Sequence, residues 1–248
     1  MKDELTKRRF EDLAEMAWKN NHYTFTSFLT EAELSEFYEI KHLSAENYTL
    51  YGGRENADRI MIRFGNPDEL GYEEPFPIKC LKIEPLSKKF SEQLTHRDFL
   101  GSLMNLGIKR SELGDIIVEE NAAYLFCTEK MSEYICREIT RVKHTVVTCS
   151  VTENLPEETE SKTTECEVQV SSERIDGVIS KVFHISRSSC SELFRQKKIF
   201  VNGRCIENSS YLLKENDRVS VRGFGKFSFV SVGGYTRKGN KIIKIEKY

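Results

Sequence analysis

The sequence has no run of apolar residues long enough to cross a membrane. A spanning helix needs roughly 18–20 consecutive apolar residues, and no stretch of the 248 residues approaches that length. The chain begins Met1-Lys2-Asp3-Glu4, which alternates charges where a secretory signal would place an apolar segment. We therefore expect a cytoplasmic protein that makes no membrane contact.

The seven cysteines lack the close spacing of structural sites. No two of them lie within three positions of one another, so the sequence has no CxxC pair of the kind that holds zinc. An odd count without a secretory signal argues against a disulfide framework. P-loop, nucleophile-elbow and HExxH motifs are also missing. We expect seven reduced thiols, no metal, no cofactor and no catalytic residue.

The net charge of −2 conceals an uneven distribution of charge. Residues 1–78 carry a net charge of −7, residues 79–150 carry +1 and residues 151–171 carry −5. Residues 172–248 contain 16 Lys and Arg against 7 Asp and Glu, a net charge of +9. A basic segment in an otherwise acidic chain favours a polyanion such as nucleic acid as the partner. The alternative is a solvated basic face without a ligand.

Residues 1–77 are expected to form an N-terminal module of helices and a small β element. Hydrophobic residues make up 39% of the whole chain, which is enough to bury folded cores. A capping box at Thr30–Glu33 predicts the start of one helix, and strand-like segments flank Gly52-Gly53 as in a hairpin. Four large apolar residues of the first helix are expected in the core: Phe10, Leu13, Met16 and Trp18.

Residues 78–151 alternate in the order strand, helix, strand, strand, helix, strand. This order is that of the ferredoxin-like split β-α-β sandwich, and the open face of its sheet is a common platform for single-stranded RNA. Tyr124 and Phe126 occupy alternate positions of one predicted strand, where they either pack in the core or stack on bases. Residues 152–171 are acidic and are expected to form a linker and a lead-in strand.

Residues 172–248 are expected to form a basic C-terminal domain. An apolar stripe predicts a first helix near residues 175–182, and Ser186 is placed to cap a second helix, whose first turn would attract an anion. Asn202-Gly203 predicts a tight hairpin turn. Two short helices would bring five basic residues near one edge that could contact phosphates: Arg174, Arg187, Arg195, Lys197 and Lys198.

These residues also match the pattern of a known domain. Arg174-Ile175-Asp176, the Ser186-Arg187-Ser188 turn, Val201-Asn202-Gly203 after Lys197, and Asp217 before Arg222-Gly223 resemble the S-four-type RNA-binding domain of ribosomal proteins. Lys197-Lys198 stands where that family has a glycine before its short strand. The segment from His96 to Arg110, followed by Gly114-Asp115-Ile116, and the turn at residues 222–227 are similar to the YlmH family. The resemblance spans essentially the full chain.

The resemblance implies an α+β protein with an N-terminal module, a ferredoxin-like domain and an S-four-type domain with an αL-like helix pair. It implies non-enzymatic binding of ribosomal RNA and tRNA on large subunits that carry a stranded peptidyl-tRNA, in quality control of incomplete chains. We expect a monomer. The expected RNA contacts are Arg174, Ser186, Arg187, Ser188, Arg195, Lys197, Lys198, Asn202, Arg204, Arg222 and Lys226, with a possible second surface at Arg97, Lys109 and Arg110.

An RNA-modifying enzyme is the main alternative. Arg174-Ile175-Asp176 is similar to the Arg-Leu-Asp around the catalytic aspartate of pseudouridine synthases, which often carry an S-four-type domain. Their large catalytic domain follows the RNA-binding domain, whereas only 65 residues follow Phe183 here. We therefore expect Asp176 to be a structural acid that pairs with a basic side chain. A protein-binding adaptor that acts through the acidic N-terminal module is a third possibility.

Overall fold

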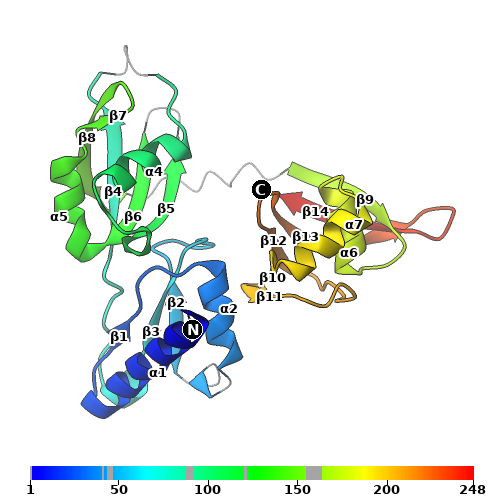
Figure 1. The fold of residues 1–248 in the computed structure, drawn as a ribbon, viewed down its shortest axis with the longest axis horizontal. Helices are drawn as coiled ribbons and strands as arrows, with labels where there is room; N and C mark the ends of the chain where they lie inside the picture. The colour runs from blue at the N-terminus through cyan, green and yellow to red at the C-terminus, as the bar shows by residue number, and fades with distance from the viewer. Residues whose placement is uncertain (1, 41, 44–46, 88–91, 120–121, 155–163) are drawn as a thin grey trace. The chain divides into compact units, whose positions relative to one another are not determined.

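The computed structural model describes residues 2–40, 42–43, 47–87, 92–119, 122–154 and 164–248. The chain divides into two compact units, Met1–Glu157 and Glu158–Tyr248 (Figure 1). Within the described ranges no helix is both long and apolar enough to cross a membrane. The predicted acidic linker falls mainly on residues 155–163, which lie outside the described residues.

A small antiparallel sheet with two longer helices forms the N-terminal module of the first unit. Its elements are α1 (Lys2–Asn20), β1 (Thr24–Phe25), α2 (Glu31–Glu39), β2 (Tyr48–Tyr51), β3 (Met61–Phe64) and α3 (Pro67–Leu70). The predicted hairpin is present, because β2 pairs with β3, and β1 pairs with the other edge of β3. The capping box is also present: the Thr30 hydroxyl accepts from the Glu33 amide, and the Glu33 carboxylate accepts from the Thr30 amide.

The core of this module includes only part of the apolar stripe predicted on α1. Phe10 is 1% exposed, and Leu13 packs at the margin of the same core. The prediction for the other two residues is wrong, since Met16 is 47% and Trp18 is 77% exposed. A helix turns once in 3.6 residues, so the buried Phe10 and Ala17 share one face while Met16 and Trp18 lie on either side of it.

The rest of the first unit is a sandwich of one sheet and two helices. Its elements are β4 (Ile78–Pro85), α4 (His96–Asn105), the 3-10 turn η3 (Arg110–Glu112), β5 (Leu113–Val118), β6 (Ala123–Thr128), α5 (Glu129–Glu138), β7 (Arg141–Val142) and β8 (Thr145–Thr152). The strands are antiparallel in the order β5-β6-β4-β8-β7. This order, with α4 after β4 and α5 after β6, confirms the predicted ferredoxin-like fold.

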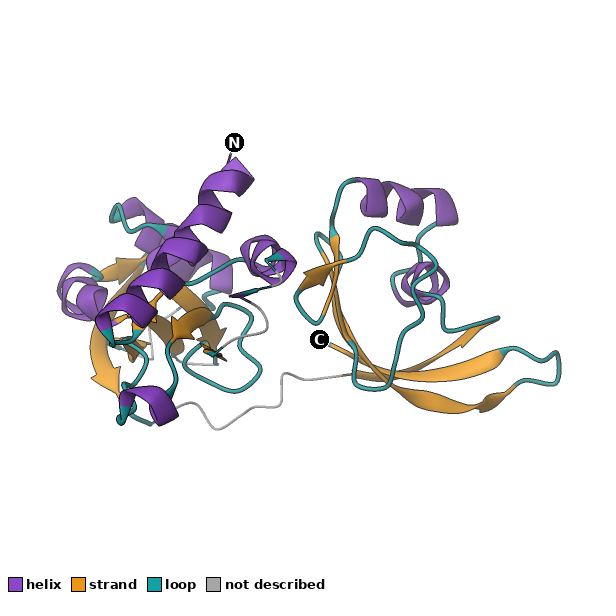
Figure 2. Ribbon diagram, turned by 90° about the horizontal axis from the view of Figure 1, so that it is seen from below, coloured by secondary structure: helices purple, strands orange, loops and turns teal. Residues whose placement is uncertain are grey.

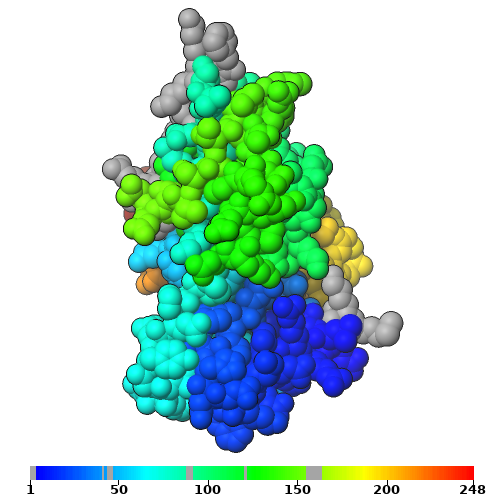
Figure 3. Space-filling model, turned by 90° about the vertical axis from the view of Figure 1, so that its left-hand side faces the viewer, coloured from blue at the N-terminus to red at the C-terminus, as the bar shows by residue number. Residues whose placement is uncertain are grey.

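Different parts of the chain cover the two faces of this sheet. Leu125 of β6 belongs to the core that the sheet shares with α4 and α5. Its neighbour Phe126, together with Cys80 of β4, points to the opposite face and packs with Phe28 and Met61 of the N-terminal module. Figure 3 shows the module and the sandwich as one continuous body. The sheet face that we expected to be open is therefore partly occupied by protein, and Phe126 is a core residue.

The second unit is one sheet with two helices packed against it (Figure 2). Its elements are β9 (Thr164–Val170), α6 (Ile175–Val182), α7 (Arg187–Arg195), β10 (Ile199–Val201), β11 (Arg204–Cys205), β12 (Arg218–Val221), β13 (Gly225–Tyr235) and β14 (Lys241–Lys247). The strands follow the order β11-β10-β12-β13-β14-β9. The lead-in strand β9 therefore becomes the edge of the C-terminal sheet.

The predicted apolar stripe on α6 is the centre of the second core. Ile175, Val178, Ile179 and Val182 are all buried there, and residues of α7 and of the long strands complete the core. The described structure is α+β, as predicted. The domain boundaries after residues 77, 151 and 171 stay predictions.

Candidate RNA-binding surface

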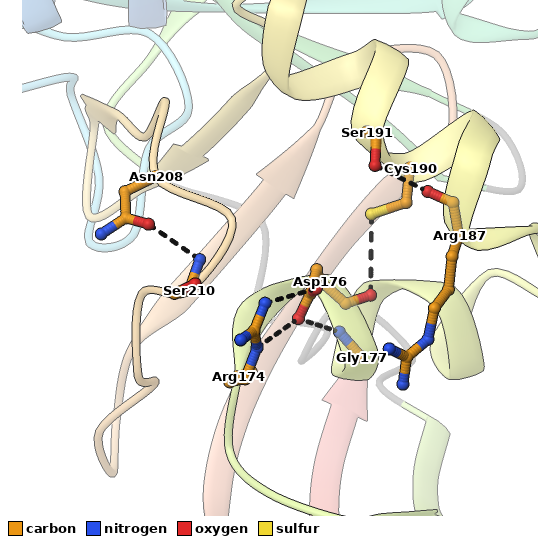
Figure 4. A network of polar contacts seen from close by, with 8 residues as sticks. All are labelled: Arg174, Asp176, Gly177, Arg187, Cys190, Ser191, Asn208 and Ser210. Carbon is orange, nitrogen blue, oxygen red and sulfur yellow. Dashed lines mark hydrogen bonds and ion pairs between the residues drawn. The ribbon is translucent and has the colours of Figure 1, made fainter.

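Arg174 and Asp176 form a forked ion pair at the start of α6 (Figure 4). The guanidinium donates from Nε to Oδ1 at 3.1 Å and from Nη2 to Oδ2 at 2.9 Å. Asp176 also accepts a hydrogen bond of 2.8 Å from the Gly177 amide. This is the pairing that we expected of Asp176. The side chain of Arg174 stays 45% exposed, so its guanidinium can meet a further anion.

Asp176 is held in its ionised form. Burial acts to raise its pKa, but the hydrogen bonds from Arg174 and Gly177, with the positive charges of Arg174 and Arg187, outweigh burial and place the pKa below its ordinary value. The side chain of Arg187 extends from α7 toward the first turn of α6 (Figure 4). The carboxylate therefore offsets the repulsion between two guanidinium groups that share this edge.

The first turn of α7 is suited to an anion. Ser186 is the N-cap residue, and its hydroxyl accepts from the Ser189 amide at 3.0 Å and lies 2.8 Å from the Ser188 hydroxyl. The free amides and the positive end of the helix dipole favour a negative ligand. Arg187, the first residue of the helix, is exposed. The helix end, the hydroxyl groups and the guanidinium together offer the donors that a phosphate accepts from.

The residue that follows α7 has a backbone conformation that glycine normally adopts. Lys197 has a φ of 52°, in the left-handed region. The amides of Lys197 and Lys198 donate to the carbonyl groups of Phe194 and Leu193, which ends the helix in a Schellman motif. Lys197 therefore replaces the expected glycine at a cost of roughly 1–2 kcal/mol in backbone strain.

The five basic residues predicted to share one edge form two groups. Because α7 has nine residues, its two ends are about 12 Å apart. At its C-terminal end, Arg195 pairs with Glu192, and Lys197 pairs with Glu207 at 3.0 Å. Their use as one RNA-contacting edge stays a prediction. The structure places Arg174 with Arg187, and Arg195 with Lys197 and Lys198.

Two other predicted contacts have partners inside the domain. The Asn202 side chain donates to Asp217 at 2.8 Å and accepts from the Arg218 amide at 2.9 Å, so it holds the hairpin turn to β12. The Arg222 guanidinium lies 4.8 Å from the centre of the Phe200 ring and stays exposed. The remaining predicted contacts lie on strands: Arg204 on β11 and Lys226 on β13.

An aromatic and basic cluster at the turn between β12 and β13 was missed in the sequence. Phe224 is 44% exposed, and its ring centre lies 6.0 Å from that of Phe183. The Lys247 ammonium group lies 5.1 Å from the Phe183 ring centre. Aromatic rings next to cations suit the stacking and charge of RNA bases and phosphates. The position of Phe224 in the basic turn of residues 222–227 could have indicated its role. From the sequence, that turn was used only as a point of resemblance to the YlmH family.

The three candidate contacts of the first unit differ in availability. Arg97 and Lys109 are exposed. Arg110 is half-buried, and its Nη1 donates to the carbonyl oxygens of Leu113 and Gly114 at 2.8 and 3.1 Å. Arg110 therefore fixes the start of β5. Among the described residues, no contact partner is common to Arg97, Lys109 and Arg110.

A buried polar network joins the N-terminal module to the sandwich. The Arg59 guanidinium donates to the carbonyl oxygens of Leu113 at 2.8 Å and Phe28 at 3.0 Å. The buried Asp115 carboxylate accepts from the Arg54 guanidinium at 3.2 Å and from two amides of the same loop, at 2.9 and 3.0 Å. Arg59 is thereby committed to main-chain carbonyl groups inside the fold, and Arg54 is paired with Asp115.

The titratable side chains of the described residues were compared with the needs of a metal site. No group of three or more His, Cys, Asp or Glu side chains among these residues could hold a metal ion. All seven cysteines are free thiols. Burial raises the pKa of Cys80 and of Cys190 to about 11, so both thiols are protonated near neutral pH.

Two family models match the chain. Residues 72–155 match the model described as "Putative RNA-binding domain in YlmH", and residues 173–219 match the S4 domain, which is the S-four-type domain expected from the sequence. Both segments make the chain similar to the YlmH family of S4-domain proteins. The first match covers the ferredoxin-like sandwich, and the second covers α6, α7, β10 and β11. The chain therefore carries an S4 domain and a domain that matches the RNA-binding model of YlmH.

Individual proteins are similar to this chain to different extents. The "Ribosome-associated protein quality control protein P2" of Bacillus subtilis is 27% identical over 207 residues, which are 79% of this chain and 76% of that protein. The solved structure of "Cell division protein ylmH from Streptococcus pneumoniae" aligns with a TM-score of 0.48 at 17% identity, over 61% of this chain and 92% of that chain. An "Uncharacterized RNA pseudouridine synthase" of Aquifex aeolicus is 38% identical over 50 residues, about a fifth of each protein.

Proposed function

We propose that this protein binds RNA of the large ribosomal subunit through the edge formed by α6 and α7. The exposed Arg187 at the capped start of α7, next to the Arg174–Asp176 pair, carries the proposal. An RNA backbone offers a row of phosphates, and each phosphate contact by Lys or Arg releases counterions that favour binding. The S4 domain match and the net charge of +9 in residues 172–248 support the same partner.

The finer role that we propose is binding of ribosomal RNA and tRNA on stalled large subunits during quality control of incomplete chains. The Bacillus subtilis relative supports it by its name, and it aligns over about three quarters of its own length. We propose that the protein acts as a cytoplasmic monomer and that it binds without catalysing a reaction. Asp176 supports the non-enzymatic role, because its carboxylate is committed to Arg174 and Gly177.

Substitution of Arg187 tests the proposal. Arg187→Ala removes one exposed guanidinium and leaves the buried core of the S4 domain unchanged, so the domain should fold normally. We expect the full-length variant to bind large subunits that carry peptidyl-tRNA about tenfold more weakly, as measured by co-sedimentation. Lys214→Ala, which removes an exposed cation elsewhere in the same unit, is the control. Equal co-sedimentation of the wild type and Arg187→Ala would contradict the assignment.

A pseudouridine synthase activity is the second candidate, because a 50-residue segment matches such a protein. That match leaves about four fifths of the synthase without a counterpart. Mapping of pseudouridine in ribosomal RNA from cells with and without the gene separates the two functions. A modification that disappears with the gene and returns with the wild-type protein would favour the enzyme. An unchanged map favours the binding protein.

A further inference from the structure

The hairpin of β13 and β14 extends the S4 domain with an element that the family model does not include. The S4 match ends at residue 219, whereas β13 begins at Gly225 and β14 ends at Lys247. β14 also pairs along its whole length with β9, so the hairpin has a three-stranded base. Figure 1 shows the β13–β14 loop, in orange to red, projecting beyond the rest of the second unit.

The tip of this hairpin has a defined turn. The Thr236 amide donates to the Asn240 carbonyl at 2.7 Å, and the Gly239 amide donates to the Thr236 carbonyl at 2.9 Å. Gly239 has a φ of 79°, as in a three-residue hairpin loop that ends in a left-handed glycine. The two central positions of the turn are therefore Arg237 and Lys238. A turn that is closed by hydrogen bonds presents these side chains with little loss of backbone entropy on binding.

The side chains of the tip are exposed and basic. Arg237 and Lys238 are exposed and have no ion-pair partner among the described residues. Tyr235, at the end of β13, is 68% exposed, which is unusual for a large aromatic side chain. Residues 225–248 contain six Lys and Arg against one Glu. Cations around an exposed aromatic ring match the two features of RNA, charged phosphates and flat bases.

The base of the tip is fixed next to the start of α6. Lys241, the first residue of β14, forms an ion pair with Glu173, which immediately precedes Arg174. The hydrogen bond to Glu173 raises the pKa of Lys241, so its charge persists at physiological pH. This contact ties the hairpin to the same chain segment that holds the Arg174–Asp176 pair. The hairpin is therefore attached to the chain segment that leads into α6.

We propose that the hairpin tip is a second RNA-contact element of the protein, in which Arg237 and Lys238 bind backbone phosphates and Tyr235 stacks on a base. The proposal rests on the proposed function, because it assumes that the second unit binds RNA. It adds a contact outside the S4 domain match, at residues that are not among the RNA contacts expected from the sequence.

The decisive experiment removes the two tip charges in the full-length chain. The double variant Arg237→Ala with Lys238→Ala is compared with the wild type on two probes: large ribosomal subunits that carry peptidyl-tRNA, and deproteinised large-subunit RNA. We expect about tenfold weaker binding to both probes. The slope of log affinity against log salt should become less steep by about 1–2, since each lost phosphate contact removes about 0.9.

Two matched controls separate a local contact from a general charge effect. Arg8→Ala with Arg141→Ala removes the same charge from exposed positions of the first unit and should change affinity less than about twofold. Tyr235→Ala should weaken binding about fivefold, whereas Tyr235→Phe keeps the ring and should bind as the wild type does. The substituted side chains are exposed, so the variants should fold as the wild type does. Amide exchange of β13 and β14 measures whether they do.

The outcomes distinguish this inference from the proposed function. If the wild type does not bind the subunits, the proposed function is contradicted. The RNA contact of the tip is then tested with deproteinised RNA alone. Equal affinity of the tip variant and the wild type for that RNA overturns the inference. It is also overturned if the tip variant binds subunits weakly but RNA normally, because the tip would then contact a ribosomal protein.

Discussion

Arginine has opposite roles in the two units of this protein. In the first unit, Arg59 and Arg110 turn inward and donate to main-chain carbonyl groups. In the second unit, Arg187 and Arg222 stay exposed within residues 172–248, which carry a net charge of +9. A cation that satisfies buried carbonyl groups stabilises the fold and is lost to ligands. The number of arginines in a region therefore does not measure its capacity to bind RNA.

The largest expected effect tests whether the covered sheet face of the first unit is a core. Phe126→Ala should lower the free energy of unfolding of the first unit by about 3–5 kcal/mol, because Phe126 is 1% exposed and packs against the N-terminal module. Tyr124→Ala on the same strand, at a half-buried position, should cost clearly less. Urea unfolding with amide exchange of β6 measures both. A small loss of unfolding free energy for Phe126→Ala, together with weakened RNA binding, would contradict the assignment of Phe126 to the core.

A second substitution addresses the polar joint between the module and the sandwich. Asp115→Asn keeps the shape of the side chain but removes the charge that accepts from Arg54 and from two amides. We expect a loss of about 2–3 kcal/mol in the free energy of unfolding of the first unit. The exposed Glu55→Gln in the same loop is the control and should be neutral. RNA affinity should change for neither variant at a temperature where both are folded.

The end of α7 offers a test in which stability and binding move in opposite directions. Lys197→Gly should raise the free energy of unfolding of the second unit by about 0.5–1 kcal/mol, because glycine adopts the left-handed φ of 52° without strain. The lost ion pair with Glu207 is exposed and offsets little of this gain. RNA affinity should fall, since one cation is removed. Amide exchange of β10 and β12 gives the stability, and a rise in affinity would contradict the proposed contact.

The smallest effect is a dependence of the second unit on acid. The hydrogen bond from Lys241 lowers the pKa of Glu173, and the pKa of Asp176 is also below its ordinary value. Both carboxylates therefore add stability above their ordinary pKa values near 4, and that stability is lost as the pH falls through their lower folded values. Thermal unfolding between pH 5 and pH 2 should show this loss. Asp176→Asn should make the dependence shallower, and an unchanged profile would speak against the pairing.

Much of the fold followed from local sequence patterns. The order of elements at residues 78–151 predicted the ferredoxin-like sandwich, and the Thr30–Glu33 box and the apolar stripe of α6 have the structure expected of them. The burial of Met16 and Trp18 was predicted wrongly, because helical spacing shows that residues share a helix but not how wide its buried face is. The cover over Phe126 depends on packing between distant segments, which no local pattern records.

Less of the candidate site than of the fold could be predicted from the sequence. Charge counts identified the basic domain, yet they could not show that Asn202 is committed to Asp217 or that Arg110 donates to β5. Such roles depend on which carbonyl or carboxylate lies nearby in three dimensions. The tip residues Arg237 and Lys238 were overlooked because their exposure results from the projecting hairpin rather than from a motif.

We propose that RNA binding depends on the exposed arginines of the second unit rather than on the cations of the first. The most direct measurement is the affinity of two full-length variants for large subunits that carry peptidyl-tRNA, at one salt concentration. Arg187→Ala should raise the dissociation constant about tenfold, and Arg97→Ala with Lys109→Ala should change it less than about twofold. A larger loss for the pair in the first unit than for Arg187→Ala would contradict the account.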